Sequence, residues 1–345
     1  MNETLCTDAA NLVKSLGYLT PSILNLVSCT GSLFIFSRII RNHLFKTLYH
    51  VNIKVLLTLH ILGTVGISVC CMASIGLTLS NAYVAKTDCD FFFLTDSCSM
   101  LRRAFLIFFI LTPFSHASIF VERSYASYLL GAYERVGVMF SMVLGFFSVT
   151  GSVSIAGVVT RYENKDELLT SCIAFSSSAS IGDDVYFMLK FLGVSEFVIF
   201  LLYIVLIVLN KLRWGRIVGN VDDRYQVNAT FMVVLFLSPV VVSCCLVTSI
   251  YISGGVILRF FKADLSLSTY KTIAANIFVI PHLALFTMIG FNYALTRVSR
   301  DAVQKTARAL AHSQETAGRF HENITKIWEK QYFEKQKSMK AIHQA

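Results

Sequence analysis

Residues 186–209 read YFMLKFLGVSEFVIFLLYIVLIVL, and this apolar stretch carries only two charged side chains, Lys190 and Glu196. An α-helix rises 1.5 Å per residue, so a stretch of this length spans about 36 Å and can cross the roughly 30 Å hydrocarbon core of a bilayer. No water reaches that core, so backbone N–H and C=O groups must pair within the segment, and the stretch lacks the alternation of barrel strands. The stretch therefore predicts a transmembrane helix.

Six further stretches have the same character, and they lie at about 18–40, 50–79, 99–121, 137–159, 229–257 and 270–293. The composition agrees, because 55% of the 345 residues are hydrophobic and 15% are charged, whereas soluble domains have roughly 45–50% and about 25%. We therefore predict an all-α membrane protein in which residues 18–293 form a seven-transmembrane helix bundle.

The distribution of basic residues predicts the orientation of this bundle. If the N-terminus is outside, nineteen of the 30 Lys and Arg residues fall on the cytoplasmic side, as the positive-inside rule describes. The outer segments carry nine basic residues against eleven carboxylates. Residues 1–17 are thus predicted to be extracellular and residues 294–345 to form a cytoplasmic tail. The net charge of +9 then belongs to one membrane face and does not indicate nucleic-acid binding.

Both flanking segments contain a recognisable pattern. Asn2-Glu3-Thr4 is a glycosylation sequon, which makes Asn2 a candidate acceptor on the outer side. Apolar residues recur at helical spacing within the basic tail, and they are Phe320, Ile324, Ile327, Trp328 and Tyr332. The tail is therefore predicted to contain an amphipathic helix that binds membrane lipids or a partner protein.

Four of the nine Cys residues lie outside the bilayer or at its outer edge, where disulfides can form. A bond from Cys98, at the top of the third span, to Cys172, in the loop after the fourth, would pin that loop over the bundle. Cys89 is an alternative partner for Cys172, and a second bond from Cys6 to Cys89 is left open. No Cys or His spacing indicates a metal site.

Ionisable groups inside apolar spans are candidates for a ligand pocket, because charge in the bilayer is costly. Glu196 lies ten residues into its span and should face the bundle interior, as a ligand contact or as a carboxyl that bridges helices. The other candidates are Arg102, Arg103, Lys190 and His282. The two arginines could form a cationic rim for an anionic ligand or mark the interface, and Lys190 could instead extend its ammonium to the interface. His282 could equally be an interior histidine with a partner.

Three prolines lie inside predicted helices, at Pro113, Pro239 and Pro281. Each removes one backbone hydrogen bond, so each favours a kink. The kinks would either allow the helices of the bundle to move or only let the helices pack against one another.

An acid and an arginine, Glu122 and Arg123, stand side by side at the inner end of the third span. Glu122 follows Cys98 by 24 residues, so a continuous helix would separate them by about 36 Å, close to the full thickness of the membrane. The pair can be read as an ordinary interface cap. It can also be read as a switch, in which Arg123 exchanges its neighbouring carboxylate for a partner that enters when helices move apart.

Seven spans, an outer N-terminus, Cys98 above the third span and Glu122-Arg123 at its base together resemble a rhodopsin-type G-protein-coupled receptor. More narrowly, residues 122–126, ERSYA, followed by Tyr133-Glu134 are similar to the Glu-Arg-x-x-Ala and Tyr-Glu elements of nematode serpentine chemoreceptors of class alpha/beta and the related class alpha. Residues 49–54, YHVNIK, are a second likeness. The seventh span departs from the general receptor pattern, since it has no Asn-Pro-x-x-Tyr motif.

This resemblance implies a chemosensory receptor in the plasma membrane of a sensory neuron, crossing it several times. Such a receptor binds an extracellular small-molecule or peptide ligand and signals by helix rearrangement to a cytoplasmic heterotrimeric G protein, with Glu122 and Arg123 as the activation switch. It is not an enzyme and needs no cofactor.

Other function classes find less support in the sequence. Motifs for metalloprotease, serine hydrolase and nucleotide-binding chemistry are missing. A transporter of a small solute is the alternative, but seven spans with one deep acid do not divide readily into the paired repeats of transporters.

The predicted topology can be tested with epitope tags at both ends of the chain. On intact cells, an antibody should stain an N-terminal tag and should reach a C-terminal tag only after permeabilisation, because the basic tail is retained in the cytoplasm. Staining of the C-terminal tag on intact cells would contradict the charge-based orientation.

Overall fold

The computed structural model describes residues 3–41, 50–129, 132–133, 136–173, 175, 178, 180–216, 221–261, 264–297 and 300. Asn2 and the amphipathic helix predicted for the tail lie outside these residues. Residues 1–293 form one compact unit and residues 294–345 a second. The helix bundle belongs to the first unit.

Among the described residues, seven helices are long and apolar enough to cross a membrane, which confirms the predicted fold class. The spans are Leu16–Ile39, Val51–Asn81, Thr95–Leu129, Met139–Val159, Gly182–Arg213, Ser238–Phe260 and Ser268–Arg297. They belong to α2 (Leu16–Ile39), α3 (Val51–Val84), α4 (Thr95–Leu129), α5 (Met139–Val159), α6 (Gly182–Arg216), α7 (Val221–Phe260), and α8 (Leu267–Ile277) with the helix that resumes after it. Several of these helices extend beyond the predicted stretches, because apolar composition marks the hydrocarbon crossing rather than the helix ends.

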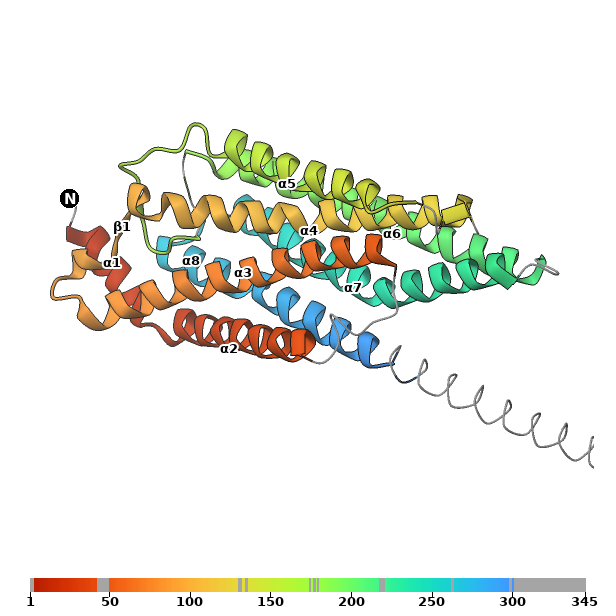
Figure 1. Ribbon diagram of the computed structural model, residues 1–345. Helices are drawn as coiled ribbons and strands as arrows, with labels where there is room; N and C mark the ends of the chain where they lie inside the picture. The colour runs from red at the N-terminus through yellow and green to blue at the C-terminus, as the bar shows by residue number, and fades with distance from the viewer. Residues whose placement is uncertain are drawn as a thin grey trace, which may run out of the picture. The chain divides into compact units, whose positions relative to one another are not determined.

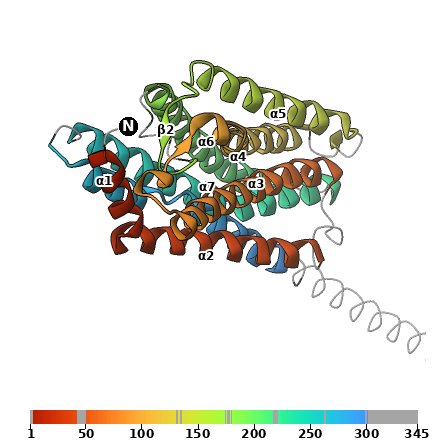
Figure 2. The same cartoon turned by 90° about the vertical axis from the view of Figure 1, so that its left-hand side faces the viewer.

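The long helices of this unit run side by side, with α3 and α4 at the centre (Figure 1; Figure 2). In the most apolar 18 residues of each span, 61% of the residues are buried in α3 and in α4. In α2, α5 and α6 only 22% of them are buried. The peripheral helices expose large apolar side chains, such as Phe146 and Phe147 on α5. Such a surface would aggregate in water but suits contact with lipid tails.

Small hydroxyl side chains join the central helices to their neighbours. Ser118 Oγ of α4 lies 2.8 Å from Ser148 Oγ of α5, and Ser68 Oγ of α3 donates to Ser32 Oγ of α2 at 3.1 Å. Such residues let helices approach closely and satisfy their own polar groups between helices, as membrane interiors require.

The N-terminal segment, predicted only as extracellular, contains a helix of its own, α1 (Glu3–Lys14). Leu12 and Val13 bury their side chains in a cluster with Phe91 of the short helix η2 (Asp88–Phe91). A disulfide between Cys6 and Cys89 joins the same two elements. Figure 1 shows α1 beside β1 (Phe93–Leu94) at one end of the bundle, which we call the outer end after the predicted topology.

Two of the three prolines lie in uninterrupted helices, since α4 continues through Pro113 and α7 through Pro239. At Pro281 the helix is interrupted: α8 ends at Ile277 and helical structure resumes at residue 280. Proline has no N–H for the carbonyl four residues before it, and Ile277 O instead accepts from Val279 N at 2.8 Å. The interruption leaves the Phe278 carbonyl free to accept a side-chain donor, Asn25 Nδ2, at 3.3 Å.

Close packing of α3 on α4 depends on Gly66, because a Cβ there would overlap the ring of Phe108. We expect Gly66→Ala to destabilise the bundle by about 1–3 kcal/mol through this overlap. The measurement is the thermal unfolding midpoint of the purified protein in detergent. Gly76→Ala is the matched control, since it lies on the same helix with nothing within 4 Å of the added Cβ. Equal midpoints for the two variants would contradict the packing argument.

Candidate functional site

The predicted switch pair is buried at the end of α4 opposite Cys98, which we call the inner end. Glu122 is fully buried and Arg123 is 3% exposed. Arg123 donates from Nε to Glu122 Oε2 and from Nη2 to Oε1, so the contact is bidentate. Paired, charge-assisted bonds of this kind fix geometry and are the stronger class of protein hydrogen bond. The pair is therefore buried, whether it serves as a cap or as a switch.

Tyr133, in the connection between α4 and α5, completes the environment of the pair. Its hydroxyl donates to Glu122 Oε1 and accepts from Arg123 Nη2 at 3.2 Å. The centre of its ring lies 5.5 Å from the guanidinium carbon of Arg123, within the range of a cation–π contact. Burial, reinforced by the Glu122 carboxylate, raises the pKa of Tyr133, so the phenol remains a proton donor at neutral pH.

Asn52, in the first turn of α3, extends this arrangement to two more helices. Its Nδ2 donates to the Tyr133 hydroxyl at 3.2 Å, and its Oδ1 accepts from Ser141 Oγ of α5 at 3.2 Å. The inner polar cluster therefore comprises Asn52, Glu122, Arg123, Tyr133 and Ser141, and it ties α3, α4 and α5 together. All three sequence elements that carried the family resemblance contribute to it, although Tyr49 and Glu134 fall outside the described residues.

One turn beyond the pair, α4 is also bonded to α6. Ser127 Oγ donates to Asn210 Oδ1 at 3.0 Å, and Arg213 Nη1 donates to the Ser127 carbonyl at 2.7 Å. The inner end of α4 is thus connected on one side to α3 and α5 and on another to α6.

Glu196 lies inside the bundle, as its position in the span predicts, but it already has a partner. His116 Nδ1 of α4 lies 2.9 Å from Glu196 Oε1, and both residues are buried. His60 of α3 stacks on His116 with ring centres 4.4 Å apart, and its Nδ1 lies 2.7 Å from Ser115 Oγ. Of its two readings, Glu196 fits the carboxyl that bridges helices. Sequence reasoning missed both histidines, although an ionisable residue in an apolar span is itself a signal.

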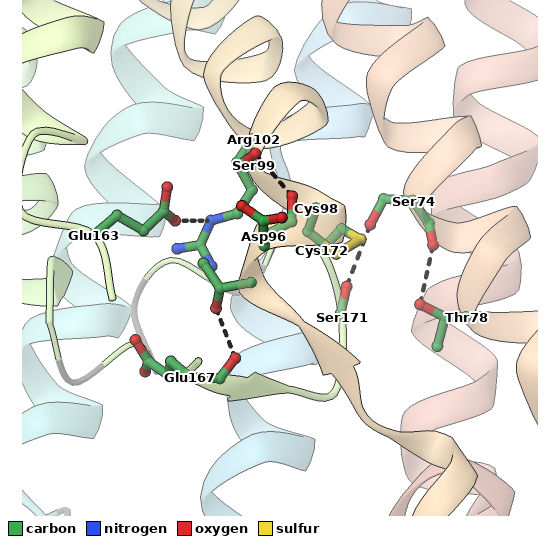
Figure 3. Close-up of a disulfide and its surroundings, with 11 residues drawn as sticks. Ser74, Thr78, Asp96, Cys98, Ser99, Arg102, Glu163, Glu167, Ser171 and Cys172 are labelled. Carbon is green, nitrogen blue, oxygen red and sulfur yellow. Dashed lines mark hydrogen bonds and ion pairs between the residues drawn. A yellow bond between two sulfur atoms is a disulfide. The ribbon is translucent and has the colours of Figure 1, made fainter. Parts of the chain in front are cut away.

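The loop between α5 and α6 is tied down at the outer end, as Figure 3 shows. The structure joins Cys98 to Cys172, and β1 pairs antiparallel with β2 (Leu168–Leu169), with Phe93 opposite Leu169. Thr95 N and Oγ1 both donate to the Glu167 carbonyl, at 3.0 and 2.8 Å. The loop is thereby held against the outer end of α4.

Arg102 also serves to anchor this loop rather than to form an exposed cationic rim. It is fully buried, and its Nε lies 2.9 Å from Glu163 Oε1 (Figure 3). Its guanidinium carbon lies 4.9 Å from the Phe175 ring centre. Burial raises the pKa of Glu163, although Arg102 opposes that rise. Arg103 points to the exposed side of α4, because adjacent helical residues face different directions.

An open cavity of about 830 Å³, counted with its mouth, lies between the helices below this loop. It is lined by Tyr18, Ser22, Asn25, Ile75, Thr78, Leu79, Thr170, Ser171, Ile173, Tyr251, Lys271, Ala274, Ala275 and Phe278. None of the five candidates from sequence lines it. Lys190 is exposed beside the Tyr186 ring, and His282 Nδ1 lies 2.6 Å from Ser28 Oγ. The cavity joins residues from four helices and a loop, so one sequence gives no signal for it.

Within the part of the chain that the structure describes, no group of three His, Cys, Asp or Glu side chains lies close enough together to hold a metal ion.

Comparison with known proteins identifies close similarity to one receptor family. The family model described as "Serpentine type 7TM GPCR receptor class ab chemoreceptor" matches residues 3–329. Serpentine receptor class alpha-39 of Caenorhabditis elegans is 30% identical over 280 residues, which cover 79% of this chain and 73% of that protein. Serpentine receptor class beta-16 of the same organism is 22% identical over 313 residues, covering 89% and 90%.

The pairing of the four Cys residues at the outer end can be tested directly. Peptide mapping of the unreduced protein should find Cys98 linked to Cys172 and Cys6 linked to Cys89, because the loop and α1 are held at these points. Cys172→Ala should lower delivery to the cell surface, measured by surface labelling, whereas Cys245→Ala on α7 should not, since that thiol is free. A peptide linking Cys89 to Cys172 would contradict the pairing.

Proposed function

Because the chain belongs to the class ab family of serpentine chemoreceptors and is a G-protein-coupled-receptor-like chemosensory receptor, we propose that its inner polar cluster is the switch through which it signals. Membership of this family does not favour the alternative function of a solute transporter. The family consists of chemoreceptors and is not a family of enzymes. We place the receptor in the plasma membrane of a sensory neuron, with its ligand outside and a heterotrimeric G protein as its cytoplasmic partner.

The observation that carries the proposal is the complete pairing of a buried charge pair at a junction of helices. Glu122 and Arg123 satisfy each other, and Tyr133 satisfies both. Removing one partner of a buried ion pair costs about 3–5 kcal/mol, because the other charge is left unpaired. The resting arrangement is therefore well defined, and Arg123 leaves Glu122 only when another acceptor replaces it.

Tyr133 makes this exchange depend on helix position. It belongs to the connection between α4 and α5, yet its hydroxyl bonds both to Glu122 of α4 and to Asn52 of α3. When α3 and α4 shift relative to each other, both bonds cannot persist, and Arg123 loses a neighbour that holds its guanidinium. A movement at the outer end is thus converted into release of a charge at the inner end, which supplies the two discrete states that a switch needs.

The proposal predicts opposite effects for the two members of the pair. Glu122→Gln removes the charge that holds Arg123, worth about 1.5–3 kcal/mol as a charge-assisted bond, so the ratio of active to resting receptor should rise about 10- to 100-fold. Arg123→Ala should abolish signalling, and the double variant should be as silent as Arg123→Ala alone. The measurement is basal nucleotide exchange on co-expressed G proteins at matched surface density.

Arg38→Ala is the matched control, because Arg38 is an exposed arginine on the inner half of α2. It should leave basal exchange unchanged. If the double variant stays as active as Glu122→Gln, Arg123 is not required for coupling and the pair serves only to cap the helix.

A further inference from the structure

We infer that the cavity at the outer end takes a small amphipathic molecule with one anionic group and one hydrogen-bond donor, paired with Lys271 and Asn25. The inference rests on the proposed function, because it names the chemistry of the ligand that this receptor would sense.

The walls and roof of the cavity come from elements that the fold holds in place. Thr170, Ser171 and Ile173 form the roof, and the bond between Cys98 and Cys172 fixes the loop at the centre of these three. Ser171 Oγ lies 3.4 Å from Ser74 Oγ of α3 (Figure 3). The cavity is therefore open to one side and bounded on the others by elements whose positions the disulfide and the helix contacts fix.

Lys271 is the cationic residue among those that line the cavity, and the lining holds no carboxylate. Its side chain is half-buried on α8, with Nζ 6.0 Å from the Phe92 ring centre, and it makes no ion pair with any described residue. A partly desolvated ammonium without a counter-charge is costly, and a ligand carboxylate would offset that cost with a charge-assisted hydrogen bond. A cationic ligand would meet repulsion.

Asn25 is the reason that the ligand needs a hydrogen-bond donor, and this requirement is independent of Lys271. It is 5% exposed, and its Nδ2 donates to the Phe278 carbonyl that the interruption at Pro281 leaves free. This bond fixes the orientation of the amide, since only its NH₂ can face a carbonyl oxygen. Asn25 Oδ1 then remains buried and without a partner among the described residues. Oδ1 has no surface open to the cavity, so a ligand donor reaches it only when the lining side chains shift, and until then the buried acceptor costs about 1–3 kcal/mol.

The remaining lining residues determine which apolar framework the ligand can have. Tyr18, Tyr251 and Phe278 contribute rings, and Ile75 and Leu79 contribute aliphatic surface. These flat apolar walls lie between one cation and one buried acceptor. They favour a ligand with an aromatic or short aliphatic framework that carries the anionic group at one end and the hydrogen-bond donor at the other.

The test measures direct binding to purified receptor in lipid nanodiscs. The probes are 4-hydroxybenzoate, 4-hydroxyphenylacetate and 3-(4-hydroxyphenyl)propanoate, which vary the separation of carboxylate and hydroxyl. Each is compared with the acid that lacks the hydroxyl, with the corresponding neutral alcohol and with the corresponding amine. At least one hydroxy acid should bind, and its alcohol and amine should bind about 10- to 100-fold more weakly.

Two substitutions assign the contacts. Lys271→Met should lower the affinity of that acid about 10- to 100-fold and remove the preference for acid over alcohol, whereas Lys190→Met, on another outer lysine outside the cavity, should change neither. Asn25→Ala should remove the preference for the hydroxylated acid over its parent acid. A misfolded variant is recognised because it loses both preferences together with its thermal unfolding transition.

Binding of alcohols or amines as tightly as acids, binding unaffected by Lys271→Met, or failure of all three acids would each overturn the inference. These outcomes are independent of the switch, because basal nucleotide exchange in the Glu122 and Arg123 variants needs no ligand. Conversely, acid binding with no effect of those variants on exchange would leave the cavity assignment standing and remove the proposed switch.

Discussion

The structure depends on the absence of water from the bilayer core. Backbone groups there must pair within their own helix, and each polar side chain must find a partner on another helix or turn back on its own. That requirement accounts for Ser118 beside Ser148, for His116 beside Glu196, and for Arg123 beside Glu122. Polar side chains in this chain are therefore not scattered exceptions to an apolar bundle but the points at which particular helices are joined.

These junctions occur along a single helix. At its outer end α4 is bonded through Cys98 to the loop, at its centre His116 contacts α6 and α3, and at its inner end the inner polar cluster reaches α3 and α5. Because α4 is continuous from Thr95 to Leu129, it connects all three junctions. The cavity itself is lined by other elements, and it is linked to α4 through the loop that Cys172 bonds to Cys98.

The outer cavity is one place where this pairing is incomplete. Asn25 Oδ1 has no hydrogen-bond partner and the Lys271 ammonium has no ion-pair partner among the described residues. Unpaired polar groups lower the stability of the empty receptor, and that same free energy becomes available when a complementary molecule binds. Incomplete pairing at the outer end and complete pairing at the inner end suit a receptor whose resting state is closed until a ligand arrives.

The sequence by itself determined the fold, because seven apolar stretches of membrane-spanning length leave the chain no other way to satisfy its backbone. It also predicted Glu122-Arg123 as a functional pair and placed Glu196 in the interior, whereas Tyr133 and Asn52 stood only in segments that resembled the family and were given no role. Only the tertiary structure decided which groups meet. Arg102 turned inward to Glu163 while Arg103 stayed exposed, Glu196 was paired with His116, and Asn25 was bonded to the Phe278 carbonyl, 253 residues away. Helical periodicity fixes which side of a helix a residue occupies, but the partner on that side depends on how the helices are rotated and packed, and that is a property of the whole bundle.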